Sequence, residues 1–208
     1  MSTDLGAQYR AARIRITDLL SDDLADTPVP ATPMWNVHDL LAHLAGTTED
    51  VRDGNLEGVA TDAWTAAQVE RGRDKSVSEL LAVWTENAPL LETFLSSPDG
   101  MAAFRAVLDV HTHEADLLNA LDQPVVLPDE FLGWVSRRLI RDFDHQVADA
   151  GLDPVVVDAS SLEVFRGRFG RRTAAEVCTY GWSADPEPYL DTWFVFGRAE
   201  TSLGERTT

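Results

Sequence analysis

Two segments decide the fold of this chain: Trp35-Asn-Val-His-Asp-Leu-Leu-Ala-His43-Leu44 and Asp109-Val-His-Thr-His113-Glu-Ala-Asp-Leu117. In the first segment the apolar residues recur at the helical period, and His43 lies on the apolar stripe. In the second segment Asp109 and His113 are four residues apart, so they project side by side from one helix face. The sequence therefore predicts two helices that direct imidazole and carboxylate groups toward a shared interior.

This combination of side chains is typical of a catalytic metal site. Two imidazole nitrogens and one carboxylate oxygen make three protein ligands and leave coordination positions open for water or substrate. A single buried histidine is more often a hydrogen-bonded core residue. An inward carboxylate next to an inward histidine is costly to bury without a compensating partner, however. We therefore predict that His43, Asp109 and His113 bind a metal ion.

The other polar residues of the two segments are not expected to bind the metal. His111 lies about 200° around the helix from His113 and is expected to face solvent. We also expect His38 to be exposed, since it lies near a helix start. Asp116 either accepts a hydrogen bond from the second nitrogen of His113 or is a surface acid. Glu114 points away from the ligand face and receives no role.

Charge and composition restrict the classes of function. The chain has 208 residues, with 35 acidic and 17 basic side chains and a formal net charge of -18. This charge disfavours binding to nucleic acid and to anionic membranes. No apolar run approaches the ~20 residues that span a bilayer, and the N-terminus has no signal-peptide pattern, so we expect a cytoplasmic protein. The single cysteine, Cys178, gives neither a disulfide nor a redox pair.

The hydrophobic pattern predicts a mainly α-helical protein. Four long helices joined by short connections favour an up-and-down four-helix bundle within residues 1–150, followed by a small α(+β) extension at 151–208. The extension is expected to contain a short strand near Pro154 and two short helices. The helices expected in the chain cover residues 4–21, 37–53, 63–73, 76–96, 101–121, 128–150, 161–169 and 173–179.

Capping residues and prolines refine these limits. Asn36 is expected to cap the second helix in a variant capping box with Asp39, and Ser76 or Ser78 is expected to cap the helix over 76–96. Pro89 is expected to interrupt that helix. Its inward row is expected to include Leu80, Leu81, Trp84, Leu90, Leu91 and Phe94.

These motifs resemble those of a known family. Residues 35–44 resemble the W-[ST]-V-x-D-L-x-x-H-L opening of the DinB-like family that contains mycothiol-dependent maleylpyruvate isomerase and mycothiol S-transferases. Residues 109–117 are similar to its second motif. The stretch from Gly170-Arg-Arg-Thr to Trp182-Ser-Ala-Asp-Pro-Glu-Pro-Tyr-Leu is similar to the closing segment of many actinobacterial members.

The resemblance implies a DinB-like bundle with a divalent metal held between helices. His43, Asp109 and His113 match the ligand positions, zinc is the expected ion with nickel as an alternative, and the low-molecular-weight thiol mycothiol is the expected cosubstrate. The isomerase has glutamate where this chain has Asp109. The segment after residue 150 is also shorter than the isomerase's second domain.

Three functions follow from the motifs and the resemblance. The first is a mycothiol-dependent metalloenzyme, an isomerase or S-transferase acting on a small electrophile, as a monomer or homodimer. Arg171 and Arg172 are then candidates for binding a carboxylate of the thiol or substrate, against the alternative of surface solvation or pairing with acids. The second is a non-catalytic DinB-like protein that binds metal or a small molecule in stress or accessory roles. The third is a hydrolase that uses metal-bound hydroxide.

Overall fold

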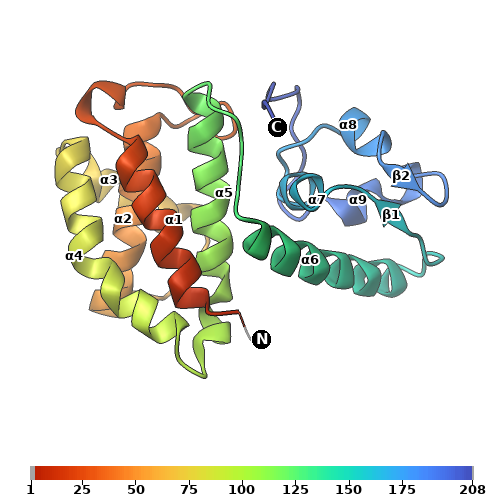
Figure 1. Ribbon diagram of the computed structural model, residues 1–208, viewed down its shortest axis with the longest axis horizontal. Helices are drawn as coiled ribbons and strands as arrows, with labels where there is room; N and C mark the ends of the chain where they lie inside the picture. The colour runs from red at the N-terminus through yellow and green to blue at the C-terminus, as the bar shows by residue number, and fades with distance from the viewer. Residues whose placement is uncertain (1–2, 208) are drawn as a thin grey trace. The chain divides into compact units, whose positions relative to one another are not determined.

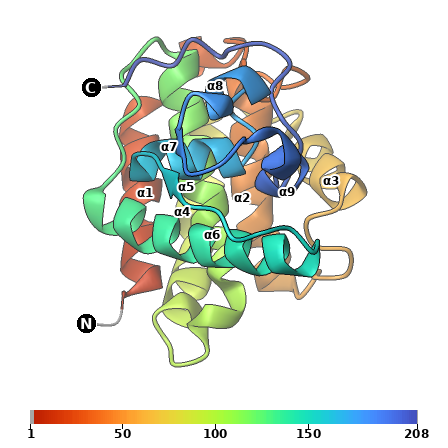
Figure 2. The same cartoon turned by 90° about the vertical axis from the view of Figure 1, so that its right-hand side faces the viewer.

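A computed structural model describes residues 3–207 and confirms the mainly helical fold. The chain divides into two compact units, one ending at Gln123 and the other beginning at Pro124. Figures 1 and 2 show the helices of both units. Among the described residues, no helix combines the length and apolar character needed to cross a membrane.

The N-terminal unit is built on four long helices. The main helices of this unit are α1 (Leu5–Leu19), α2 (Val37–Asp53), α4 (Val77–Leu95) and α5 (Phe104–Ala120), and the shorter α3 (Asp62–Gly72) lies between α2 and α4 in sequence. Two 3-10 turns, Asp22–Leu24 and Gly100–Ala103, precede α2 and α5. The helices α1 and α2 each pack against both α4 and α5, and α3 packs on α2. The expected helical bundle is therefore confirmed.

The short helix α3 allows α2 and α4 to run in the same direction. When the colours in Figure 1 are followed, α1 and α5 run in one direction, while α2 and α4 run in the opposite direction. Because α3 returns the chain between them, α2 and α4 lie side by side with the same direction. The contact between α2 and α5 brings the two sequence motifs together.

The predicted helix starts are confirmed. Asn36 accepts a hydrogen bond from the backbone N–H of Asp39, and the Asp39 side chain accepts one from the N–H of Asn36. Ser76 forms the same kind of capping box with Glu79 at the start of α4. Such reciprocal caps satisfy amides that the first helical turn leaves unpaired.

The expected interruption at Pro89 is wrong, because α4 continues through it. Pro89 lies on the exposed face of the helix. The carbonyl one turn earlier, which loses its N–H partner, therefore lies where water can hydrate it. The predicted inward row is also wrong at two positions, since Leu90 is 53% exposed and Phe94 is 42% exposed. The buried row of α4 is instead made of Leu80, Trp84, Ala88, Leu91 and Leu95.

The C-terminal unit begins with a long helix. Its elements are α6 (Asp129–Asp149), β1 (Val157–Asp158), α7 (Ser161–Arg168), α8 (Ala174–Cys178), β2 (Gly181–Trp182), a 3-10 turn (Glu187–Tyr189) and α9 (Leu190–Trp193). The two strands pair antiparallel, with Val157 opposite Trp182. The helix α6 packs on α7 and α9, so it belongs to the same compact unit as they do. The boundary expected from the sequence lies after residue 150 and would separate α6 from them.

Candidate metal centre

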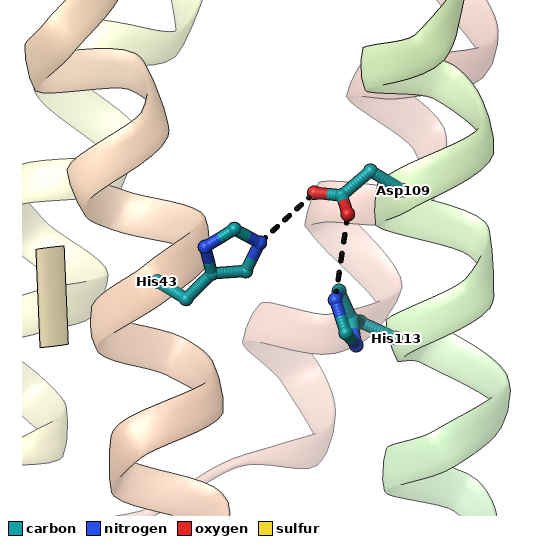
Figure 3. A group of neighbouring side chains, drawn as sticks. All are labelled: His43, Asp109 and His113. Carbon is teal, nitrogen blue, oxygen red and sulfur yellow. Dashed lines mark hydrogen bonds and ion pairs between the residues drawn. The ribbon is translucent and has the colours of Figure 1, made fainter. Parts of the chain in front are cut away.

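The first component of the centre is His43, which α2 places inside the bundle. The capping box fixes where α2 begins, and the helical repeat then directs His43 toward α5. Its side chain is only 7% exposed. Figure 3 shows its ring facing Asp109, with Nε2 of His43 3.3 Å from Oδ2 of Asp109.

The second component is the pair on α5. Asp109 and His113 are one turn apart, and Nε2 of His113 lies 3.4 Å from Oδ1 of Asp109. The carboxylate thus lies between two imidazoles, as Figure 3 shows. One ligand atom from each of His43, Asp109 and His113 lies within 4.8 Å of the others. The structure therefore brings together all three residues expected to bind metal.

The chemistry of this donor set fits a divalent cation. Both Nε2 atoms and a carboxylate converge from two helices, and imidazole and carboxylate are ligands that zinc accepts. The side chain of Asp109 is 36% exposed, against 8% for His113. Asp109 is therefore only partly buried, whereas the two histidines are more fully enclosed.

The second nitrogen of each imidazole also has a polar partner. Nδ1 of His113 lies 3.2 Å from Oδ2 of the fully buried Asp116. Nδ1 of His43 lies 2.7 Å from Oε1 of the fully buried Gln68 on α3. Of the two expectations for Asp116, the hydrogen bond to His113 is the one observed. Sequence reasoning missed Gln68, because it lies 25 positions from His43 on a short helix with no motif.

Electrostatic interactions favour charged groups at this centre. Burial raises the pKa of Asp109, but the imidazoles of His43 and His113 outweigh this effect and hold the pKa well below its usual range. Burial lowers the pKa of His113, and the carboxylates of Asp109 and Asp116 outweigh it and raise the pKa to about 9. The centre therefore stabilises an ionised carboxylate next to positive charge, which is the environment a bound cation provides.

An aromatic ring packs against both histidines. The ring centroid of Trp35 lies 5.4 Å from that of His43 and 6.0 Å from that of His113. Trp35 precedes α2 in a loop tied down by backbone bonds, including one from the N–H of Val29 to the carbonyl of Trp35. This packing limits the rotation of the two imidazoles.

The expectation that His111 faces solvent is wrong. His111 is 1% exposed, and its Nδ1 lies 2.8 Å from the carbonyl oxygen of Val107. Burial lowers the pKa of His111 to about 4. The reason is that neighbouring helices cover α5 on several sides, so that every residue from Val110 to Leu117 is buried. A position opposite the ligand face is therefore still inside the protein.

Two other polar neighbours have structural partners. His38, which was expected to be exposed, is partly buried, with Nε2 2.8 Å from the carbonyl oxygen of Lys75. Glu114 is buried and forms an ion pair with Arg15 on α1. Neither joins the cluster of His43, Asp109 and His113.

The two arginines considered for carboxylate binding lie in the C-terminal unit. Arg172 is buried and forms ion pairs with Glu163 and Glu205. A side-chain nitrogen of Arg171 donates a hydrogen bond to the carbonyl of Phe169. Pairing with nearby acids is thus observed for Arg172, and binding of a ligand carboxylate stays a prediction.

Comparison with known proteins agrees with the geometry. Residues 7–121 match the family model described as the mycothiol maleylpyruvate isomerase N-terminal domain. No curated protein and no solved structure matches the chain significantly. The family match covers more than half of the 208 residues and includes both helices of the candidate metal centre. The chain therefore belongs to the mycothiol maleylpyruvate isomerase N-terminal domain family.

Proposed function

We propose that this protein is a thiol-dependent metalloenzyme that acts on a small electrophile as an isomerase or S-transferase. His43, Asp109 and His113 hold a divalent ion, with zinc first and nickel second, and mycothiol is the thiol. The observation that carries this proposal is the convergence of the three ligand atoms within 4.8 Å, in a domain whose family is described by mycothiol and maleylpyruvate isomerase.

The bound ion would lower the pKa of a thiol so that the reactive thiolate is present at neutral pH. The protein's own residues then have three tasks. Asp109 supplies the anionic ligand, and its side chain is the most exposed of the three. His43 and His113 supply nitrogen ligands, with the ion taking the place of any proton on Nε2. Trp35 packs against both rings.

The reaction chemistry belongs to the thiol and the substrate. In an isomerase, the sulfur forms a bond to one carbon of an activated cis double bond, the remaining single bond rotates, and elimination restores the double bond and the thiol. In a transferase, the sulfur displaces a leaving group and stays on the product. Both reactions require a nucleophilic thiolate and use no cysteine of the protein, in agreement with a single cysteine that lies far in sequence from the centre.

Recognition of an anionic substrate requires local positive charge, because the net charge of -18 repels anions at long range. We retain Arg171 and Arg172 as the proposed carboxylate-binding groups of the C-terminal unit. Arg172 would have to exchange Glu163 or Glu205 for the ligand. A bidentate contact to a carboxylate would compensate for that exchange.

The proposal is tested by turnover of a panel of small electrophiles by zinc-loaded protein, with mycothiol, with glutathione and without thiol. We expect product only with a thiol and faster turnover with mycothiol. The variant His113→Ala should lose this activity, while the control variant His145→Ala, which changes an exposed histidine, should retain it. Stoichiometric zinc without thiol-dependent turnover would favour a metal-binding accessory protein instead. Turnover without thiol would favour a hydrolase.

A further inference from the structure

A chain of buried polar contacts runs from the metal centre into α3. Oε1 of Gln68 lies 2.7 Å from Nδ1 of His43, and Nε2 of Gln68 lies 2.7 Å from Oδ2 of Asp50. Gln68 is 0% exposed and Asp50 is 3% exposed. Removing a polar group from water costs free energy, and hydrogen bonds to suitable partners offset this cost.

The carboxylate of Asp50 determines which way the Gln68 amide points. A carboxylate only accepts hydrogen bonds. Its Oδ1 accepts from Arg71 and Asn55, at 2.7 and 2.9 Å, and its Oδ2 faces Gln68. The NH2 group of Gln68 must therefore face Asp50, which leaves the amide oxygen facing His43.

The amide orientation in turn determines which ring nitrogen of His43 carries hydrogen. The oxygen of Gln68 accepts a hydrogen bond, so Nδ1 of His43 must be the donor. Nδ1 carries hydrogen in this arrangement whether the ring is neutral or protonated. In the neutral ring Nε2 then has the free lone pair, and Nε2 is the atom that faces Asp109.

We propose that Gln68, oriented by Asp50, is a positioning residue that holds His43 with hydrogen on Nδ1 and Nε2 free to bind the metal. This inference rests on the metal site of the proposed function. His113 has the equivalent arrangement, because its Nδ1 faces the carboxylate of Asp116. Each histidine thus has an acceptor at Nδ1, although the acceptors come from different helices. Partners of this kind fix the tautomer of metal-binding histidines.

The close approach of α3 depends on a glycine. A Cβ atom at Gly46 of α2 would lie 2.7 Å from Cβ of Gln68 and 2.9 Å from its Cγ. Real Cβ atoms are essentially never found so near another atom. Gly46 and His43 are three residues apart on α2. The missing side chain at Gly46 therefore lets Gln68 of α3 come close enough to contact His43.

The structure suggests a test in two steps: the acid at position 50 is first replaced by an amide, and the amide at position 68 is then replaced by an acid. In Asp50→Asn, Arg71 and Asn55 retain the side-chain oxygen, so the new NH2 group faces Gln68. Two NH2 groups then oppose each other, and Gln68 turns over so that its own NH2 faces Nδ1 of His43. In this orientation Nδ1 must accept a hydrogen bond, so the hydrogen of the neutral ring moves to Nε2. Nε2 then has no free lone pair for the metal.

The double variant Asp50→Asn with Gln68→Glu reverses this effect. The carboxylate at position 68 accepts one hydrogen bond from the amide at position 50 and another from Nδ1 of His43. The net charge and the side-chain sizes of the pair are almost unchanged. A merely structural role for the buried pair predicts loss of stability in the single variant, but no change in the ring nitrogen that carries hydrogen.

Two readouts decide the question. Nitrogen NMR of histidine-labelled, metal-free protein, with the His43 signal assigned through His43→Ala, reports whether Nδ1 carries hydrogen. Competition with a chelator reports zinc affinity. We expect Asp50→Asn to lose hydrogen at Nδ1 and to bind zinc roughly 10- to 100-fold more weakly. The double variant should regain both properties. The exposed residues Asp53 and Gln123 provide the matched controls Asp53→Asn and Gln123→Glu, which should match the unsubstituted protein.

The inference is overturned if Asp50→Asn keeps hydrogen on Nδ1 and its zinc affinity, or if the double variant regains neither. If Asp50→Asn does not fold, Gln68→Met gives the same comparison, because it leaves Nδ1 without an acceptor. Unchanged zinc affinity in Gln68→Met would then overturn the inference. If the unsubstituted protein binds no zinc, the proposed function fails, and the NMR result alone still decides whether Gln68 and Asp50 set the hydrogen position.

Discussion

Nε2 of His43 on α2 and Oδ2 of Asp109 on α5 lie 3.3 Å apart, although the residues are 66 positions apart in sequence. His113 approaches the other oxygen of the same carboxylate. Asp109 is thus shared by both imidazoles, and the packing of α2 on α5 holds the arrangement. Substitutions at these positions should therefore affect metal binding more than folding.

We expect His113→Ala to lower zinc affinity by more than about 100-fold, because loss of an outer partner of a ligand already costs roughly 10- to 100-fold. The bundle should remain folded, since burial of leucine and valine side chains provides most of its stability. Zinc content and chelator competition measure the first effect, and circular dichroism measures the second. His145→Ala is the control. A variant that retains its metal would exclude His113 as a ligand.

The charge of Asp109 should matter more than its length. Asp109→Asn removes the anionic ligand between two imidazoles and should weaken zinc binding strongly. Asp109→Glu keeps the charge and should retain the metal. Chelator competition ranks the three proteins, and the exposed Asp144→Asn is the control. If Asn binds zinc as tightly as Asp, Asp109 is not a ligand, and Asp116 becomes the next candidate.

Gly46→Ala should destabilise the N-terminal unit by about 1–3 kcal/mol, as overpacking of a close contact does. The added Cβ would collide with Gln68 and push α3 away from α2. Urea unfolding measures the loss. Gly133→Ala on α6 is the matched control, because its Cβ would meet only the end of the Arg137 side chain at 3.4 Å. Equal stability of both variants would contradict the close packing of α2 and α3.

Glu163 should stabilise the C-terminal unit in a pH-dependent way. Burial raises its pKa, but hydrogen bonds from Arg172 and Tyr180 outweigh burial and lower the pKa below the usual 4.5. A lowered pKa in the folded state gives stability that is present above pH 4.5 and is lost as the pH falls through the folded value.

The variant Glu163→Gln removes this contribution. Its free energy of unfolding should therefore be lower than that of the unsubstituted protein at pH 7, and the difference should shrink below about pH 4.5. Urea unfolding at several pH values measures the difference, and the exposed Glu200→Gln is the control. A difference that is constant from pH 7 to pH 3 would show that the carboxylate charge contributes nothing.

The sequence by itself determined the main helices and predicted that His43, Asp109 and His113 lie together. Capping by Asn36 and Ser76 involves residues only three apart, and the helical period is a property of each segment alone. That period places His43 on the apolar face of its helix. It also places Asp109 and His113 on one face of theirs. These features were predictable because they depend on local geometry.

Only the tertiary structure decided how much of each helix is covered. The period places His111 opposite the ligand face, but the packing of α1 and α2 around α5 buries it as well. Conversely, Leu90 and Phe94 are apolar and yet exposed, because no helix in the described part of their unit covers that side of α4. The pairing of Gln68 with His43 likewise requires α3 to return along α2, and the sequence spacing carries no signal for it. Such contacts depend on which helices become neighbours, a property of the assembled core rather than of any one segment.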